Sequence, residues 1–348
     1  MLATPLRLSL ITPHYLPAIR GNSITVDRIA TGLSDRGAAV KVVPLDRMTP
    51  EEALAGLRDF RPDIVHGFHA TASGPLALES GRVLGAPTVV SLTGTDVNQD
   101  LDDADRSPLV GGVLAEAEAI VVFHEVIRQR VASRLPAAAP KLHVIGQAVR
   151  CRPGEFDLRG RAAIGPDAFV FLQAAGIRRV KNIPAIIPAL TALQARHPHV
   201  RYVLAGPVLE PEEGARVREL LRPLPWAVAL GAVTHHELWA ILASVDAAIN
   251  SSLSEGGMSN AVLEAMSQGI PVLAADIEGN RSVVADGEDG FLFALEAEFL
   301  DKAERLILDP ALRASLGRRA RQKISARYPP EAEIDGYLRL YQSLLAGC

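Results

Sequence analysis

The sequence predicts an α/β protein with two Rossmann-like domains, each a doubly wound parallel sheet between helices. Three observations support this fold class. Short β-branched or apolar runs alternate with longer stretches of helical periodicity, the pattern of βαβ units in a parallel sheet. The chain has 348 residues, more than one hydrophobic core usually holds. The alternation stops once, near the middle, and then starts again.

The first half should form one Rossmann-like domain. Its first helix is expected at residues 23–35. Its six strands are expected at residues 7–11, 39–44, 64–67, 88–93, 119–123 and 142–145.

The second half repeats this organisation after a linker at residues 150–165, which has no clear apolar period. Strands are expected at residues 169–173, 200–206, 228–230, 247–251, 271–275 and 290–293. A final helix at 330–345 follows the break at Tyr328-Pro329-Pro330. We therefore expect one domain at 1–149, joined by the C-terminal helix 330–348, and a second at 150–329.

Composition excludes several classes of protein. A net charge of −4 and a pI near 6.2 argue against a nucleic-acid binder, which would normally carry a basic face. No run of about 18 apolar residues indicates a transmembrane helix, although peripheral membrane contact stays open. Cys151 and Cys348 give neither a disulfide framework nor metal-ligand spacing. These features favour a reducing, cytoplasmic setting.

The stretch 250–284 is the most informative part of the chain. A strand leads into a polar, glycine-containing loop, and a helix is expected to start near Ser259. The free N–H groups at a helix start suit a diphosphate. Glu255 precedes this helix and Glu264 lies inside it, and carboxylate oxygens accept hydrogen bonds from ribose or hexose hydroxyls. The alternative is that Glu255 caps the helix and Glu264 is solvated.

This stretch resembles the EGxxxxxxEAM signature of retaining glycosyltransferase family 4, whose members have the two-domain GT-B fold with a central cleft. The resemblance implies that Glu255 approaches the donor sugar and Glu264 binds the nucleotide ribose. Eight residues separate the two acids here and seven in the family, so the extra residue is expected to form a bulge at Gly256-Gly257. The further donor contacts implied by this loop and helix start are Gly256, Gly257, Met258, Ser259 and Asn260.

A second motif, AAGIRRVK at residues 174–181, follows a predicted strand and precedes a helix that is expected to start near Asn182-Ile183-Pro184. Gly176 allows close approach of the loop, and basic side chains suit a leaving diphosphate. The family pattern implies catalytic roles for Arg179 and Lys181, again with altered spacing, and Arg178 is the competitor for Arg179. The alternative is three solvated surface charges.

In the first domain, Gly21 and Asn22 open a helix where family members bring a glycine-rich loop to the donor. The family also has a histidine that points at the reacting sugar, which implies His69, with His66 as the runner-up. Asp96, in the sequence Gly-Thr-Asp, is expected to orient the acceptor or His69, or else to cap a turn. Asp103-Ala104-Asp105 matches a DxD metal motif only by chance, so no metal site is expected.

The segments LTGTDVNQD, GIRRVK and NSSLSEGGMSNAVLEAM resemble the subfamily of glycosyltransferase 1 domain-containing proteins and their bacterial relatives, over nearly the whole chain. The selenosugar synthases of selenoneine biosynthesis are similar as well. The resemblance implies metal-independent, retaining hexosyl transfer from a UDP- or GDP-linked sugar to a small-molecule or glycan acceptor, with no cofactor. The alternatives are a selenosugar synthase using selenophosphate, a nucleotide-sugar 2-epimerase and a non-catalytic nucleotide-sugar-binding protein.

Overall fold

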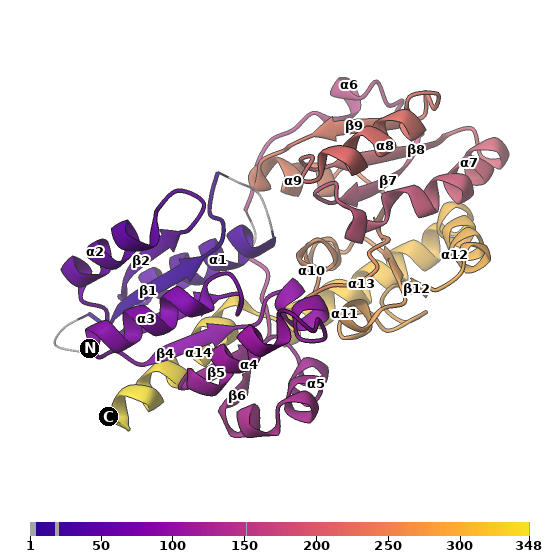
Figure 1. The fold of residues 1–348 in the computed structure, drawn as a ribbon. Helices are drawn as coiled ribbons and strands as arrows, with labels where there is room; N and C mark the ends of the chain where they lie inside the picture. The colour runs from indigo at the N-terminus through magenta and orange to yellow at the C-terminus, as the bar shows by residue number, and fades with distance from the viewer. Residues whose placement is uncertain (1–4, 18–20, 151, 348) are drawn as a thin grey trace. The chain divides into compact units, whose positions relative to one another are not determined.

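The computed structural model describes residues 5–17, 21–150 and 152–347 and divides the chain into two compact units. Unit 1 comprises Met1–Ala148 with Tyr328–Cys348, and unit 2 comprises Val149–Arg327 (Figure 1). The sequence places these divisions at 149/150 and 329/330. Cys151, Cys348 and the pair Ile19-Arg20 ahead of Gly21 lie outside the described residues.

Unit 1 contains a six-stranded parallel sheet in the order β2-β1-β3-β4-β5-β6. All six runs predicted as strands are strands, with ends that differ by up to two residues. The strands are β1 Arg7–Thr12, β2 Ala39–Pro44, β3 Ile64–Phe68, β4 Thr88–Ser91, β5 Ala119–Val122 and β6 Leu142–Val144. The helices are α1 Gly21–Asp35, α2 Pro50–Phe60, α3 Gly74–Leu84, α4 Ser107–Glu116, α5 Glu125–Arg134 and α14 Pro330–Ala346, with short turns η1 Asp96–Asp100 and η2 Pro136–Lys141.

Alternate residues of β1 enter two apolar clusters on opposite faces of the sheet. Leu8 and Leu10 of β1 pack with α1 and α14, whereas Ile11 packs with α2 and α3. This alternation is the period of two that side chains follow along a strand. Burial on both faces explains why the strands are apolar runs of the kind that sequence analysis finds.

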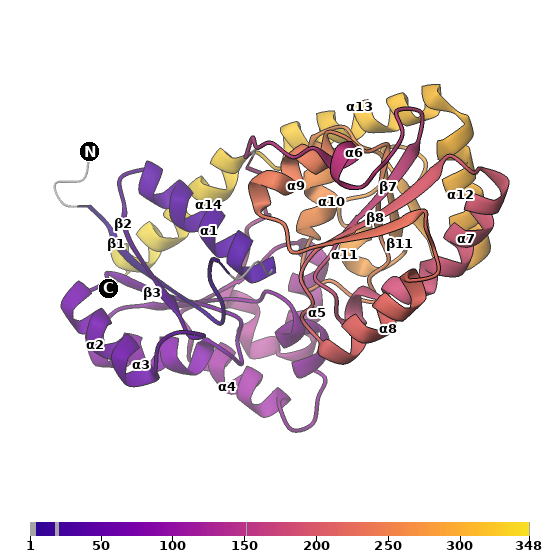
Figure 2. The same cartoon turned by 90° about the horizontal axis from the view of Figure 1, so that it is seen from above.

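The C-terminal helix α14 is a structural part of unit 1, and Figure 2 shows it beside α1. Tyr337 and Tyr341 are fully buried against the sheet. The guanidinium of Arg28 in α1 donates two hydrogen bonds to the Glu333 carboxylate, at 2.7 and 2.9 Å. Both side chains are buried, so this paired charge fixes α14 on α1.

Unit 2 contains the second six-stranded parallel sheet, in the order β12-β11-β10-β7-β8-β9. All six predicted strands are again present. The strands are β7 Phe169–Ala174, β8 Val200–Ala205, β9 Ala227–Gly231, β10 Ala247–Asn250, β11 Val272–Ala275 and β12 Phe291–Phe293. The helices are α6 Leu158–Arg161, α7 Ile187–Arg196, α8 Pro211–Leu221, α9 His235–Leu242, α10 Asn260–Ser267, α11 Glu278–Arg281, α12 Glu296–Leu308 and α13 Pro310–Arg327, with turns η3 Arg179–Lys181 and η4 Ile183–Ile186.

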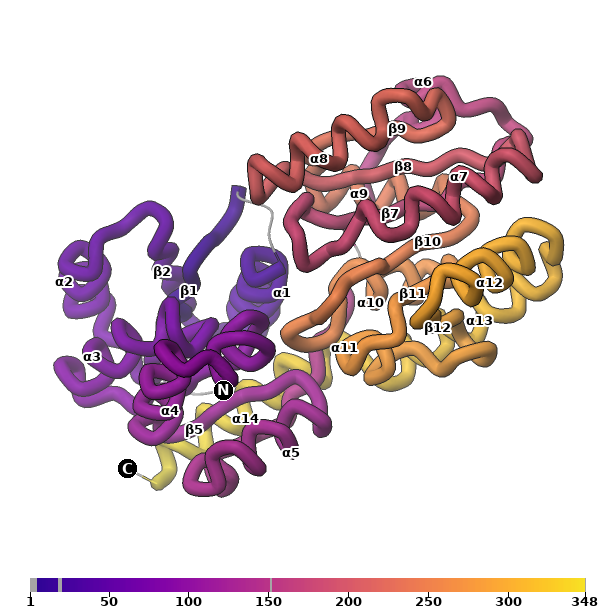
Figure 3. Tube along the Cα trace, turned by 45° about the vertical axis from the view of Figure 1, so that its right-hand side comes forward, coloured from indigo at the N-terminus to yellow at the C-terminus, as the bar shows by residue number. Residues whose placement is uncertain are grey.

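Two details of unit 2 differ from expectation. The predicted linker contains α6, because the Asp157 side chain accepts the Gly160 N–H at 2.9 Å and Leu158 is buried. The helix expected after Lys181 begins as the short turn η4 and becomes α-helical only at Ile187. Figure 3 shows α12 and α13 side by side in this unit.

Strand order places the loops that matter for function. In the second sheet the chain reverses its direction of winding between β7 and β10, which are neighbours. Ligands of open parallel sheets bind beyond the carboxyl ends of the strands at such a switch point. The loops after β7 and β10 are also bonded to each other, since the Leu253 N–H donates to Val180 O at 2.9 Å and Ser251 Oγ donates to Lys181 O at 2.8 Å.

Candidate active site

The switch point of unit 2 holds an ion pair between two residues that the sequence predicts as catalytic. Lys181 Nζ, from the loop after β7, lies 2.6 Å from Glu255 Oε1, from the loop after β10. The side chains are only 14% and 11% exposed. Strand order therefore brings together two motifs that are far apart in the sequence.

Glu255 is the centre of a polar network. Its Oε1 also accepts hydrogen bonds from Ser252 Oγ at 2.7 Å and from Asn250 Nδ2 at 3.1 Å. Burial raises the pKa of this carboxyl group, but the Lys181 charge and the donated hydrogen bonds outweigh burial and hold the pKa below its usual range. Glu255 is therefore an ionised partner for Lys181.

Asparagine side chains hold the loop that follows β10. Asn250 Nδ2 donates to Ser259 Oγ at 3.0 Å, and Asn280 Nδ2 donates to Asn250 Oδ1 at 3.3 Å. An added Cβ on Gly279 would lie 2.6 Å from Gly257 O and 2.8 Å from Glu255 Cβ, so only glycine permits this approach. Sequence reasoning did not single out Asn250, Ser252 or Asn280, although all three lie in the stretch 250–284.

Glu264 is buried in α10 and contacts a residue that sequence reasoning missed. His235 Nε2, at the first position of α9, lies 2.7 Å from Glu264 Oε1. The two consecutive histidines 235–236 were the only available signal. Of the predicted donor contacts, Gly257, Met258 and Ser259 are buried, while Gly256 and Asn260 are partly exposed.

The AAGIRRVK loop places its two arginines differently. The Arg179 side chain is exposed, and its backbone N–H donates to Glu210 Oε2 at 2.8 Å. Arg178 is half-buried, and its Nε is buried without a hydrogen-bond partner among the described residues. Gly176 has a packing role, because an added Cβ would lie 2.5 Å from Leu209 Cδ1.

In unit 1, His69 follows β3 and its φ is 87°, a left-handed conformation that costs energy for a residue with a side chain. Its Nε2 lies 2.7 Å from Thr95 Oγ1 and its Nδ1 lies 3.1 Å from Thr71 Oγ1. His69 Nδ1 is also 4.0 Å from Asp96 Oδ2. His69 and Asp96 are thus neighbours, but this distance is too long for a hydrogen bond, and Nδ1 instead accepts the Ala72 N–H at 3.4 Å.

Asp96 is fully buried and also holds the surrounding turns. Its carboxylate accepts backbone N–H groups at 2.7 to 3.2 Å, from Ala70, Thr93, Gly94 and Val97. The turn role that the sequence suggests for this residue is therefore present, while its role toward the acceptor or His69 stays a prediction.

The remaining candidates in unit 1 have local roles. His66 is buried between Tyr341 OH at 2.7 Å and Ser91 Oγ at 2.8 Å, and burial lowers its pKa to about 3. Asp103 Oδ1 accepts the N–H groups of Asp105 and Arg106 at 3.0 Å each, which makes it a turn residue. Within the described residues, no group of three or more His, Cys, Asp or Glu side chains has a metal-binding arrangement.

The loop candidates Gly21 and Asn22 form the first turn of α1. A Cβ added to Gly21 would meet nothing within 4 Å, so packing does not require glycine there. The contact of Gly21 and Asn22 with the donor stays a prediction.

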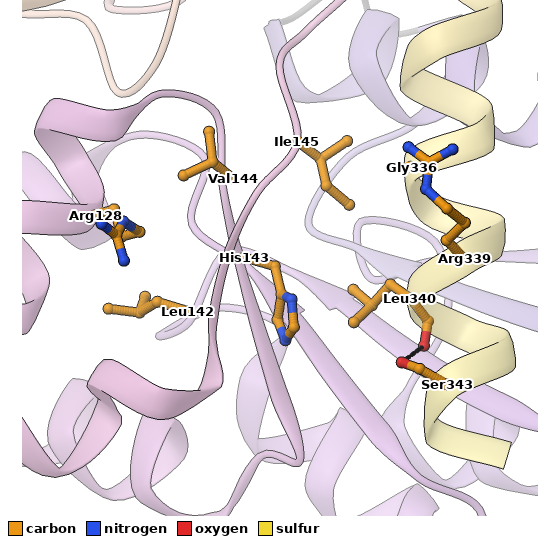
Figure 4. Close-up of a pocket in the computed structure, with 9 residues that line it drawn as sticks. All are labelled: Arg128, Leu142, His143, Val144, Ile145, Gly336, Arg339, Leu340 and Ser343. Carbon is orange, nitrogen blue, oxygen red and sulfur yellow. Dashed lines mark hydrogen bonds between the residues drawn. The ribbon is translucent and has the colours of Figure 1, made fainter. Parts of the chain in front are cut away.

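A pocket of about 500 Å³ lies at the outer edge of the first sheet, between β6, α5 and α14 (Figure 4). None of the predicted site residues lines it. Its lining residues are Arg128, Leu142, His143, Val144, Ile145, Gly336, Arg339, Leu340 and Ser343.

Comparison with known families accounts for both units. Residues 155–323 match the family model described as "Glycosyl transferases group 1", and residues 11–148 match the "Glycosyl transferase 4-like domain". The chain belongs to these glycosyltransferase families. The resemblance predicted from the motifs is confirmed. In the described residues, no helix combines the length and hydrophobicity needed to cross a membrane.

Individual relatives of this glycosyltransferase cover most of its length. It is 28% identical over 338 residues to glycosyltransferase 1 domain-containing protein 1 of Xenopus tropicalis, covering 94% of this chain and 96% of that protein. It is 28% identical over 307 residues to D-inositol 3-phosphate glycosyltransferase of Frankia alni, covering 82% and 75%.

Solved structures confirm the predicted GT-B fold class. Sucrose-phosphate synthase from Thermosynechococcus elongatus has a TM-score of 0.80 at 18% identity and covers 99% of this chain and 100% of its own. Anabaena HepE, solved in complex with UDP and glucose, has a TM-score of 0.80 at 17% identity and covers 97% and 100%.

Proposed function

We propose that this glycosyltransferase is a retaining, metal-independent enzyme that moves a hexosyl group from a nucleoside-diphosphate sugar to a small-molecule or glycan acceptor. The observation that supports this most directly is the Lys181–Glu255 pair, 2.6 Å apart at the switch point of the second sheet. A shielded cation at that edge suits a diphosphate, whose oxygens are anionic.

Lys181 is suited to the leaving group. An ammonium has three N–H donors, and Glu255 needs only one of them. The other two can reach phosphate oxygens while Glu255 keeps the ammonium in place. Negative charge grows on the diphosphate as the glycosidic bond breaks, and in comparable sites one preorganised donor lowers the barrier by about 3–4 kcal/mol.

The other parts of the site are assigned by the same chemistry. Glu264 is proposed to accept hydrogen bonds from the ribose hydroxyls, and the N–H groups at the start of α10 to bind phosphate. In unit 1, we propose that His69 points at the reacting sugar and that Asp96 orients the acceptor or His69. In a retaining reaction the diphosphate would leave and the acceptor attack on the same face of the sugar, through an oxocarbenium-like state.

One structural relative suggests which sugar nucleotide to test first as the donor. Anabaena HepE was also solved with UDP-glucose, with a TM-score of 0.79 to this chain. At 16% identity this likeness concerns the fold, so we take UDP-glucose as the first donor to test, with the GDP-linked sugar as the alternative.

A thermal-shift screen against UDP, GDP and their sugars tests the donor proposal. A ligand at 100 times its dissociation constant adds about 2.7 kcal/mol of stability, so the correct diphosphate should raise Tm by several degrees. No shift with any diphosphate would contradict the proposal.

Two measurements test the mechanism. The anomeric configuration of the first-formed product, followed by NMR, should match that of the donor, and inversion would contradict a retaining mechanism. Activity should be nearly unchanged in EDTA, because basic side chains and a helix start supply the positive charge. Loss of activity in EDTA that magnesium or manganese restores would contradict metal independence.

A further inference from the structure

His235 is the residue outside the predicted motifs that contacts a proposed substrate-binding side chain. It starts α9, whereas Glu264 lies in α10, and the contact joins Nε2 to Oε1 at 2.7 Å. The side chains are 12% and 7% exposed. No feature of the local sequence requires the two to meet, so the contact is a product of the tertiary structure.

In the hydrogen bond between His235 and Glu264, only the histidine can be the donor. A carboxylate only accepts hydrogen bonds, so the ring nitrogen that faces it carries the proton and donates. His235 Nδ1 is buried and has no hydrogen-bond partner among the described residues. Within those residues, the bond to Glu264 is therefore the one hydrogen bond that the imidazole makes.

The backbone around His235 is held independently of that bond. Thr234 and Glu237 form a reciprocal capping box, with Thr234 N donating to Glu237 Oε2 at 2.7 Å and Glu237 N to Thr234 Oγ1 at 3.2 Å. Gln268, directly after α10, also donates from Nε2 to Trp239 O in the middle of α9, at 3.1 Å. The imidazole therefore projects from a fixed position toward α10.

We propose that His235 is a positioning residue, which fixes the Glu264 carboxylate so that its second oxygen, Oε2, is presented to the ribose diol of the donor nucleotide. The inference rests on the proposed ribose role of Glu264. A glutamate side chain has several rotatable bonds, and a ligand that must immobilise such a side chain loses affinity. In the described residues Oε2 makes no hydrogen bond of its own, which leaves it for the ligand.

The size of the effect follows from the entropy of one ordered side chain, about 0.5–1.5 kcal/mol. Removing His235 should therefore weaken nucleoside-diphosphate binding about 2- to 12-fold. The loss should concern the ribose, so the affinity ratio between a ribonucleoside diphosphate and its 2′-deoxy form should fall as well. A purely structural role for His235 would weaken both ligands equally and leave that ratio unchanged.

Calorimetry with UDP or GDP, whichever stabilises the chain, and with the matching 2′-deoxy diphosphate tests this. The variants are His235→Ala, His235→Gln, Glu264→Ala and the double variant His235→Ala with Glu264→Ala. Glutamine keeps an N–H donor at a similar reach, so His235→Gln should restore the wild-type ratio. The matched control is His236→Ala, because His236 is exposed and its Nδ1 lies 2.9 Å from Pro153 O instead.

The expected result is a weaker and less ribose-selective His235→Ala variant, with no further loss from His235→Ala when Glu264 is already alanine. The inference is overturned if Glu264→Ala weakens binding while His235→Ala does not. It is also overturned if the two losses add independently or if the ratio is unchanged in His235→Ala. Unchanged affinity in Glu264→Ala would instead overturn the ribose role itself, and with it this inference.

Discussion

Asp96 in unit 1 and Glu255 in unit 2 are both ionisable groups at the carboxyl edge of a parallel sheet, but they are held in different ways. Asp96 accepts backbone N–H groups, from Ala70 and the turn around residue 94. Glu255 accepts from the side chains of Lys181, Ser252 and Asn250. Backbone donors are fixed by the fold, whereas side-chain donors can change partner. Unit 1 therefore has a rigid turn around His69, whereas the side-chain contacts of Glu255 in unit 2 can rearrange, as the proposed binding of a diphosphate to Lys181 requires.

The strongest test of the comparison is Lys181→Ala, which removes the side-chain cation of unit 2. We expect turnover to fall about 100- to 1000-fold, the usual loss when one preorganised donor to a developing anion is removed. The Michaelis constant for the donor should change less, because the interaction strengthens as charge develops. Steady-state kinetics measures both. Lys302→Ala is the control, since Lys302 pairs with Asp286 at 2.9 Å, and a turnover within a few-fold of wild type in Lys181→Ala would remove the pair from catalysis.

The next prediction concerns how the unfolding free energy of each unit depends on pH. His66 in unit 1 has its pKa lowered to about 3 by burial, so between about pH 6.5 and 3 the unfolded chain binds a proton that the folded chain does not. Unfolding free energy should then fall by about 1.4 kcal/mol for each pH unit below 6.5. Glu255 has a lowered pKa, so its contribution is present above its unfolded pKa of about 4.5 and is lost only as pH falls through the lower folded value.

Urea unfolding between pH 7 and 4 checks this, with probes placed in each unit. Unit 1 should weaken first, and His66→Gln should flatten its pH slope. Equal slopes in the wild type and His66→Gln would show that His66 does not control the acid sensitivity of unit 1.

Asp96→Asn tests the backbone N–H groups that donate hydrogen bonds to the Asp96 carboxylate. Asparagine keeps one acceptor but turns an N–H₂ group toward backbone N–H donors, so we expect a loss of about 1–3 kcal/mol in unfolding free energy. Chemical denaturation measures it. Asp103→Asn is the matched control, because the Asp103 carboxylate is exposed and likewise accepts backbone N–H groups, two in number. This control should change the unfolding free energy by less than about 0.5 kcal/mol. Equal losses in the two variants would show that burial of Asp96 is immaterial.

The smallest expected effect separates the two arginines of the AAGIRRVK loop. The sequence favours Arg179, but Arg178 is the half-buried one, and its Nε has no hydrogen-bond partner in the described part of the chain. We expect Arg178→Ala to lower turnover about tenfold, or about 1.4 kcal/mol, and Arg179→Ala to lower it less. The reverse order in donor kinetics would support the family-based assignment instead.

The fold was predictable from sequence because the strands are short apolar runs bounded by breakers, and the four inner strands of each sheet are buried along most of their length. The two sheets followed directly from this pattern. Helix α6 was missed because one capping carboxylate, Asp157, and one buried side chain, Leu158, define it. Four residues provide too little length for a helical period to be seen.

Only the residues of the candidate site that lie in a recognisable sequence motif could be predicted. Lys181 and Glu255 were identified, but their contact depends on strand order, which local sequence does not specify. The orientation of Glu255 depends on the backbone at Gly256 and Gly257, where the extra residue is expected to form a bulge, and glycine allows many backbone conformations. His235 was missed because its role arises from a contact with Glu264, 29 residues along the chain.

The return of α14 to unit 1 has a consequence for synthesis of the protein. Its residues Tyr337 and Tyr341 complete a core that otherwise belongs to the first 148 residues. At about 5–20 residues per second, translation reaches α14 some tens of seconds after the first sheet has been made. Throughout that interval the nascent first unit exposes the apolar face that α14 will cover, while unit 2 can complete its own core. Chaperones that recognise exposed apolar surface should therefore bind the N-terminal unit of this chain during its synthesis, although that unit is made first.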